Sequence, residues 1–99
     1  MARPPKLDAA EIARRLQSLP GWELKDGKLH RQFAFPDFAE AFRFMTAVAA
    51  EAERLQHHPE WSNVYNRVTV DLVTHDAGGI TALDFELAGR AQQLAGQAG

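Results

Sequence analysis

The chain of 99 residues contains no cysteine, which excludes disulfide bonds, thiolate metal sites and cysteine nucleophiles. This absence fits a reducing compartment, and we predict a cytoplasmic protein. The chain also lacks an excess of one charge, because 11 Lys and Arg stand against 13 Asp and Glu, a formal net charge of −2. Lys and Arg are scattered, with no run longer than Arg14–Arg15, so we expect no direct nucleic-acid partner bound through its phosphates.

Long apolar runs are absent as well. No segment approaches the roughly 20 residues that cross a bilayer, so no membrane partner is expected. Residues 1–7 contain two prolines and no apolar stretch typical of a secretory signal, and we predict that they form a mobile lead-in. A chain of this length has room for one core. We therefore predict a single domain over residues 1–99.

Three positions show the capping-box spacing, in which an acceptor side chain at a helix start is followed three residues later by an acidic residue. They are Asp8 with Glu11, Asp37 with Glu40, and Thr81 with Asp84. Each pair predicts the start of a helix. The first helix should end by Pro20 and the second before Pro59, because proline cannot continue a helix.

Apolar residues recur at helical spacing after each cap, and we expect them to face the core. They are Ile12, Leu16 and Leu19 in the first helix, Phe38, Phe42, Met45, Val48, Ala49, Ala52 and Leu55 in the second, and Leu83, Leu87, Ala91 and Leu94 in the third.

Strand patterns fill the remaining segments. Asp26-Gly27 lies between two short alternating runs and predicts a hairpin. Residues 67–75 alternate strongly, and together with residues 62–65 they form one long strand or two strands with a bend. The order α-β-β-α-β-β-α predicts an α+β fold: a two-layer sandwich with an antiparallel four-stranded sheet and helices packed on one face.

Three of the four histidines lie in the second half of the chain. His58 precedes Pro59, which pushes it into an extended conformation, so its ring should diverge from that of His57 at the helix end. Glu53 lies one helical turn before His57, where a carboxylate can accept a ring N–H and fix the tautomer. His75 lies near a strand end, before a glycine turn, where side chains can project into a cleft.

The spacing of these residues resembles the signature of the pterin-4a-carbinolamine dehydratase family. The stretch Glu53-Arg54-Leu55-Gln56-His57-His58-Pro59 is followed by Tyr65, His75 and Asp84 at the family's intervals. The flanking segments 61–66 and 74–81 are also similar to the family's sequences. Weaker similarity extends upstream through Gly21-Trp22 and residues 35–38.

The resemblance implies an enzyme that removes the C4a hydroxyl of a hydroxylated tetrahydropterin together with the N5 proton, giving the quinonoid dihydropterin. Such an elimination needs one group that donates a proton and one that accepts a proton, and histidine has a suitable pKa of about 6.5. The resemblance implies no cofactor and no metal. The pterin would come from an aromatic amino acid hydroxylase, which is the implied functional link in tetrahydrobiopterin recycling.

The same resemblance assigns roles to individual residues. His57 and His75 are the acid–base candidates, and His58 is the third catalytic member, which binds or orients the pterin. Glu53 and Asp84 would orient histidines or hydrogen-bond the substrate, and Pro59 would also contact the substrate. Trp61 would give the flat ring an apolar wall.

Simpler interpretations stand beside these roles. His30 is expected to be a surface strand residue, and Asp84 could belong only to the helix cap. Trp61 and Tyr65 could be core or interface residues. The stripe from Phe38 to Met45 is expected to be core. Zinc is disfavoured, since adjacent histidines across a helix end converge poorly on one metal ion.

A second class of function also remains open. Members of the family serve as dimerisation cofactors of a transcription factor or look like assembly factors, so a non-catalytic dimerisation or assembly module of the same fold is the alternative. The family also implies a homodimer or homotetramer. A small two-layer domain agrees with this, because it can leave helix surface or a sheet edge available for pairing.

Overall fold

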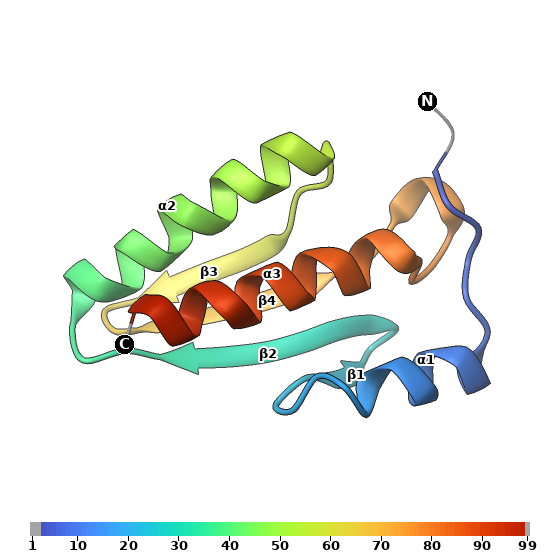
Figure 1. Ribbon diagram of the computed structural model, residues 1–99, viewed down its shortest axis with the longest axis horizontal. Coiled ribbons are helices and arrows are strands. Elements are labelled where there is room, and N and C mark those ends of the chain that lie inside the picture. Colours follow the sequence, from blue (N-terminus) through green and yellow to red (C-terminus); the bar gives the residue numbers. More distant parts are fainter. Residues whose placement is uncertain (1–2, 99) are drawn as a thin grey trace.

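The computed structural model describes residues 3–98 and has the predicted order of elements (Figure 1). The helices are α1 (Ala9–Leu16), α2 (Phe38–Leu55) and α3 (Ala82–Ala98), and a short 3-10 helix, η1, spans His75–Ala77. The strands are β1 (Glu23–Lys25), β2 (Lys28–Ala34), β3 (Glu60–Val64) and β4 (Arg67–Leu72).

The four strands form one antiparallel sheet in the order β1-β2-β4-β3. Alternation along β4 sends Val68, Val70 and Leu72 toward the core, where each is almost fully buried. Helices α2 and α3 run side by side over the sheet (Figure 1). The predicted α+β sandwich of two layers is therefore confirmed.

Two tight turns set the register of the sheet. Asp26 and Gly27 both have positive φ, 53° and 77°, which is the backbone of a type I′ hairpin turn. A second turn at Tyr65 and Asn66 joins β3 to β4, with a φ of 51° at Tyr65. The region after α2 is thus two paired strands, which decides between the two possibilities left open by the sequence.

Side-chain caps begin all three long helices as predicted. The carboxylates of Asp8 and Asp37 each accept a backbone N–H three residues on, at 2.9 Å. At α3, the Thr81 hydroxyl accepts from the Leu83 N–H, and Asp84 accepts from the Thr81 N–H in return. The capping-box prediction is therefore confirmed at the helix that carries a candidate site residue.

The core stripe predicted for α2 is partly wrong. Phe38 and Phe42 are 47% and 54% exposed, and Ala49 is exposed too. The helix carries a second apolar stripe, rotated from the predicted one and sharing the correctly predicted Val48 and Ala52 with it, and this stripe is the buried one: Ala41, Phe44, Val48 and Ala52. Small alanines let α2 approach its neighbours closely, and Phe44 packs its ring against Phe33 and Phe35. Periodicity alone does not choose between two such stripes.

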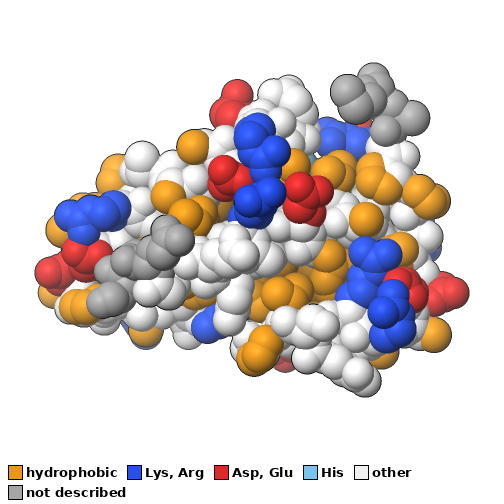
Figure 2. Space-filling model, viewed as in Figure 1, with side chains coloured by type: hydrophobic (Ala, Val, Ile, Leu, Met, Phe, Trp, Pro, Cys, Tyr) orange, Lys and Arg blue, Asp and Glu red, His pale blue; other side chains and the backbone are white. Residues whose placement is uncertain are grey.

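The first helix ends at Leu16, before the predicted Leu19, whereas the third helix agrees closely with expectation. Leu87 and Ala91 of α3 are buried, while Leu83 and Leu94 are half-buried. Charged side chains gather between the two long helices (Figure 2), where Glu51 of α2 pairs with both Arg54 and Arg90. No helix within residues 3–98 is long and apolar enough to cross a membrane.

The N-terminal segment runs along one end of the fold (Figure 1). The Leu7 N–H donates to the Ile80 carbonyl at 2.8 Å, and the Leu7 side chain packs against the core. The start of the segment, Arg3, donates to the Gln56 carbonyl at 2.6 Å. The mobility of residues 3–7 stays a prediction, while residues 1 and 2 lie outside the described part.

The hairpin turn gives a first prediction. Gly27→Ala should lower the free energy of unfolding by about 1 kcal/mol, because an L-residue is strained at a φ of 77° although nothing lies near its added Cβ. Gly89→Ala is the matched control, since it also adds a methyl group in open space but within α3. Urea unfolding should show Gly89→Ala to be stabilising by about 0.5–1 kcal/mol. Equal effects of the same sign would contradict this account.

Candidate functional site

The three predicted histidines meet at one cavity. It has a volume of about 230 Å³ and lies where the end of α2 meets the segment after β4. The lining residues are Arg3, His57, His58, Val73, Thr74, His75 and Asp76. Side chains that are far apart in the sequence therefore share one concave surface, as the spacing of the histidines predicted.

The end of α2 sends its two histidines in different directions. Gln56 adopts a left-handed conformation with a φ of 52°, which ends the helix. The next residue, His57, turns inward and is only 5% exposed. His58 turns outward, with 60% of its side chain exposed, just before Pro59. The predicted divergence of the two rings is confirmed.

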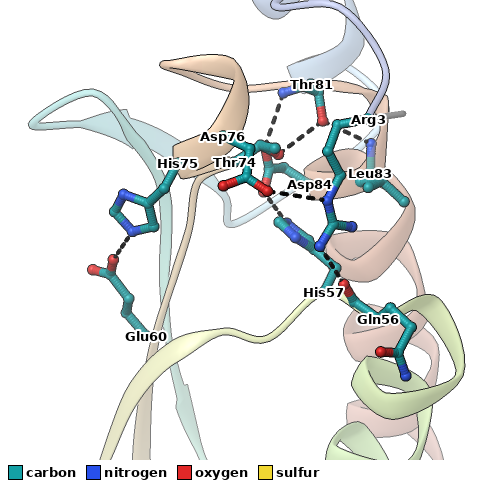
Figure 3. A network of polar contacts seen from close by, with 10 residues as sticks. All are labelled: Arg3, Gln56, His57, Glu60, Thr74, His75, Asp76, Thr81, Leu83 and Asp84. Carbon is teal, nitrogen blue, oxygen red and sulfur yellow. Dashed lines mark hydrogen bonds and ion pairs between the residues drawn. The ribbon is translucent and has the colours of Figure 1, made fainter. Parts of the chain in front are cut away.

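A buried carboxylate holds His57 (Figure 3). His57 Nε2 lies 2.5 Å from Asp84 Oδ1, and the side chains of both residues are almost fully buried. The second oxygen, Asp84 Oδ2, accepts from the Thr74 hydroxyl at 2.8 Å and from the Thr81 N–H at 2.9 Å. Asp84 is thus both a helix-capping residue and the partner of a site histidine.

The expected partner of His57 is corrected by this geometry. Glu53 does not pair with His57 but with His58, whose Nε2 lies 2.7 Å from Glu53 Oε1. The left-handed Gln56 breaks the helical spacing that would have brought residues 53 and 57 together. His57 instead reaches Asp84, 27 residues along the chain.

His75 has a carboxylate partner that the sequence analysis missed. It lies in η1 beyond the end of β4, and its Nε2 is 2.7 Å from Glu60 Oε2 (Figure 3). The other oxygen of Glu60 accepts a hydrogen bond from Lys28 Nζ. Hydrogen bonds from Lys28 and then from His75 hold the pKa of Glu60 below its usual value.

All three histidines share one pattern: each presents Nε2 to a carboxylate. An ionised carboxylate can only accept a hydrogen bond, so the proton of each neutral ring is on Nε2. The remaining nitrogen, Nδ1, then carries a lone pair that can take a proton. In each of the three cavity imidazoles, Nδ1 is thus the nitrogen without a carboxylate partner.

None of the four predicted substrate contacts lines this cavity: Glu53 and Asp84 bind its histidines from outside the lining, and Pro59 and Trp61 lie elsewhere. Trp61 is the cross-strand neighbour of the buried Val70, so its ring lies on the helix side of the sheet and packs against the core. Pro59 shapes the chain between His58 and β3 without lining the cavity. Tyr65 lies in the β3–β4 turn and is 62% exposed, so it is not part of the core.

Comparison with known proteins places the chain in one family. The family model for pterin 4 alpha carbinolamine dehydratase matches residues 5–94. A provisionally named pterin-4-alpha-carbinolamine dehydratase from Solibacter usitatus is 56% identical over 90 residues, covering 91% of this chain and 95% of the relative. A protein of the same name from Rhizobium meliloti is also 56% identical, with 94% and 91% covered. The chain belongs to the pterin 4 alpha carbinolamine dehydratase family.

Two solved structures similar to this chain carry names that describe different functions. A transcriptional coactivator/pterin dehydratase from Brucella melitensis has a TM-score of 0.88 and 44% identity, covering 91% of this chain and 98% of that one. A pterin dehydratase-like protein described as a RuBisCO assembly factor in the alpha-carboxysome has a TM-score of 0.63 and 28% identity, with 76% and 87% covered. The fold is therefore shared by relatives with catalytic and with non-catalytic names.

Other lining residues of this family member were not predicted. Thr74 lies at an inward-facing position after the buried Val70 and Leu72, and a polar residue at such a position signals a buried hydrogen-bond partner. Arg3 lines the cavity next to Asp76, whose Oδ2 is 3.8 Å from Arg3 Nε. The sequence around Arg3 does not indicate this position, because only the docking of the N-terminal segment brings Arg3 to the cavity.

Outside the cavity, His30 differs from expectation. Its side chain is only 17% exposed, and Nδ1 lies 2.8 Å from Oδ1 of its cross-strand partner Asp71. It is a paired, half-buried residue instead of a surface one. Within residues 3–98 no group of three His, Asp or Glu side chains is placed to hold a metal ion.

The contrast between buried and exposed pairs gives a second prediction. Asp84→Ala should lower the free energy of unfolding by about 3 kcal/mol, because it leaves His57, Thr74 and the Thr81 N–H without their buried partner. Glu53→Ala removes the exposed carboxylate of the His58 pair and should cost less than about 1 kcal/mol. Urea unfolding of both variants checks this, and similar losses would show that burial of Asp84 is not the deciding factor.

Proposed function

We propose that this family member is a lyase that dehydrates 4a-hydroxytetrahydropterin to quinonoid dihydropterin. The observation that carries the proposal is the cavity lined by His57, His58 and His75, each ring having a carboxylate partner at Nε2. The reaction requires proton transfer at two atoms of one small ring system. Imidazoles on different elements around one cavity are suited to that task.

The chemistry is a balanced elimination. The hydroxyl oxygen on C4a receives a proton and leaves as water, and the C4a–O bond breaks. The N5 proton is accepted by a base, while the electrons of N5 form the new C4a–N5 double bond. In our proposal His57 and His75 divide the acid and base roles, and the exposed His58 binds or orients the pterin.

The surroundings of each histidine suit these roles. The buried Asp84 stabilises the imidazolium of His57 when its Nδ1 takes a proton, as Glu60 does for His75. Arg3 and Asp76 add polar groups at the rim that can hydrogen-bond a pterin edge, and Val73 adds apolar surface. We place the reaction in the cytoplasm, in the recycling of a pterin used by an aromatic amino acid hydroxylase.

Single substitutions test this role. His75→Ala and His57→Gln should each lower the turnover number for carbinolamine loss by at least about tenfold, because a positioned acid–base group typically contributes about 10²- to 10⁴-fold. Glutamine at 57 keeps an N–H donor for Asp84, so the fold is retained. His30→Gln is the control, since this carboxylate-paired histidine lies outside the cavity.

Stopped-flow absorbance with 4a-hydroxytetrahydropterin measures these rates. Full activity in both cavity variants would refute the roles. An inactive wild-type protein with an intact fold would instead favour a non-catalytic dimerisation or assembly module, as the names of the two structural neighbours suggest for those proteins.

We also propose that the chain assembles as a homodimer or homotetramer. Phe38 and Phe42 support this, because their rings lie 5.6 Å apart on the exposed face of α2. Strand β3 supports it too, since it forms an edge of the sheet. Both surfaces lie outside the cavity-lining residues, so assembly would leave the site in each subunit.

Assembly can be tested by a charge on α2. Phe42→Glu should shift the mass measured by light scattering toward a smaller species, because a carboxylate is costly to bury in an apolar interface. Ala50→Glu is the control, as it places the same charge at another exposed position of α2. An unchanged mass for Phe42→Glu would show that this face of α2 is not the interface.

A further inference from the structure

We propose that Glu60 is a positioning residue that holds the ring of His75 by Nε2, and that Lys28 anchors Glu60 from strand β2, on the same face of the sheet. The inference rests on the proposed function, because it assigns the device that prepares one of its acid–base groups. It adds two residues that the spacing of the histidines did not indicate.

The strand register brings these residues together. Glu60 lies opposite Asp71 in β4, and Asp71 lies opposite His30 in β2, so all three side chains lie on the sheet face away from the helices. Lys28 precedes His30 by two residues and therefore shares that face. Strands β2 and β3 are separated by β4, and the long Lys28 and Glu60 side chains meet across it.

Both oxygens of Glu60 are used. Oε1 accepts from Lys28 Nζ, and Oε2 is 2.7 Å from His75 Nε2. The ammonium of Lys28 favours the ionised carboxylate, in agreement with the lowered pKa of Glu60. An ionised Glu60 accepts from Nε2–H and leaves Nδ1 of His75 as the proton acceptor.

His75 depends on this contact more than His57 depends on any single neighbour. Its side chain is 73% exposed, and within residues 3–98 the only hydrogen bond of its ring is to Glu60. The ring of His57 is enclosed by the fold around Asp84. Loss of Glu60 should therefore free the His75 ring to rotate and should leave the rest of the site in place.

A double-mutant cycle on turnover tests whether Glu60 acts through His75. Glu60→Ala should lower the turnover number about tenfold with little change in KM, since an unpositioned acid–base group loses much of its contribution. The same change should have no further effect in the His75→Ala background, while it keeps its effect in the His57→Gln background. An equal effect in both backgrounds would overturn the proposal.

The role of Lys28 is tested by a matched pair of lysine variants. Lys28→Met should reduce turnover in the same direction as Glu60→Ala but less, because Glu60 remains present without its cation. Lys25→Met is the control, as Lys25 is the cross-strand neighbour of Lys28 and no hydrogen bond joins it to Glu60 within residues 3–98. Equal rates for the two lysine variants would remove Lys28 from the proposal.

Ring ¹⁵N chemical shifts give a readout that does not require activity. In Glu60→Ala the Nε2 and Nδ1 resonances of His75 should move, while those of His58, held by Glu53, should stay. Unchanged His75 resonances would overturn the proposal even in an active enzyme. If the wild-type protein proves inactive, moved resonances would still support the positioning contact, so failure of the proposed function is distinguishable from failure of this inference.

Discussion

The buried hydrogen bond between His57 and Asp84 is the contact on which the site depends. It joins the end of α2 to the first turn of α3, and the same carboxylate binds Thr74 beyond β4. Burying a carboxylate and an imidazole is costly unless their polar atoms have partners, and here every buried side-chain polar atom within the described residues has one. Three elements are therefore tied at one point, and the cavity forms where they meet.

The positions of the other two histidines follow from this buried contact. His58 follows His57 directly, and His75 follows Thr74, so the buried network sets where both backbones lie. Their own carboxylate partners are exposed, and such pairs contribute at most about 1 kcal/mol to stability. Glu53 and Glu60 thus contact exposed rings, whereas Asp84 binds a buried ring and helps to build the cavity.

Much of the fold follows from local signals in the sequence. Asp26-Gly27, the capping residues and the prolines that follow the first two helices act through neighbouring atoms, so they predict the order of elements. The choice between two apolar stripes on α2 depends instead on what the helix packs against. Phe44 is buried because its ring packs against Phe33 of β2 and against Phe35, which follows that strand. Phe38 remains exposed.

The candidate site shows the same division between local sequence signals and contacts that depend on tertiary packing. The resemblance of this spacing to the family signature predicts that His57, His58 and His75 converge. It does not predict their partners, because a single left-handed residue, Gln56, moves Glu53 from one ring to the next. Asp84 and Glu60 are 27 and 15 residues from their histidines, so pairing depends on the sheet and on the helix packing. Two distant carboxylates and the nearby Glu53 all contact Nε2, which leaves Nδ1 as the nitrogen without a carboxylate partner in each ring. An ionised carboxylate at Nε2 selects the same tautomer for each of the three rings, although the contacts come from different parts of the fold.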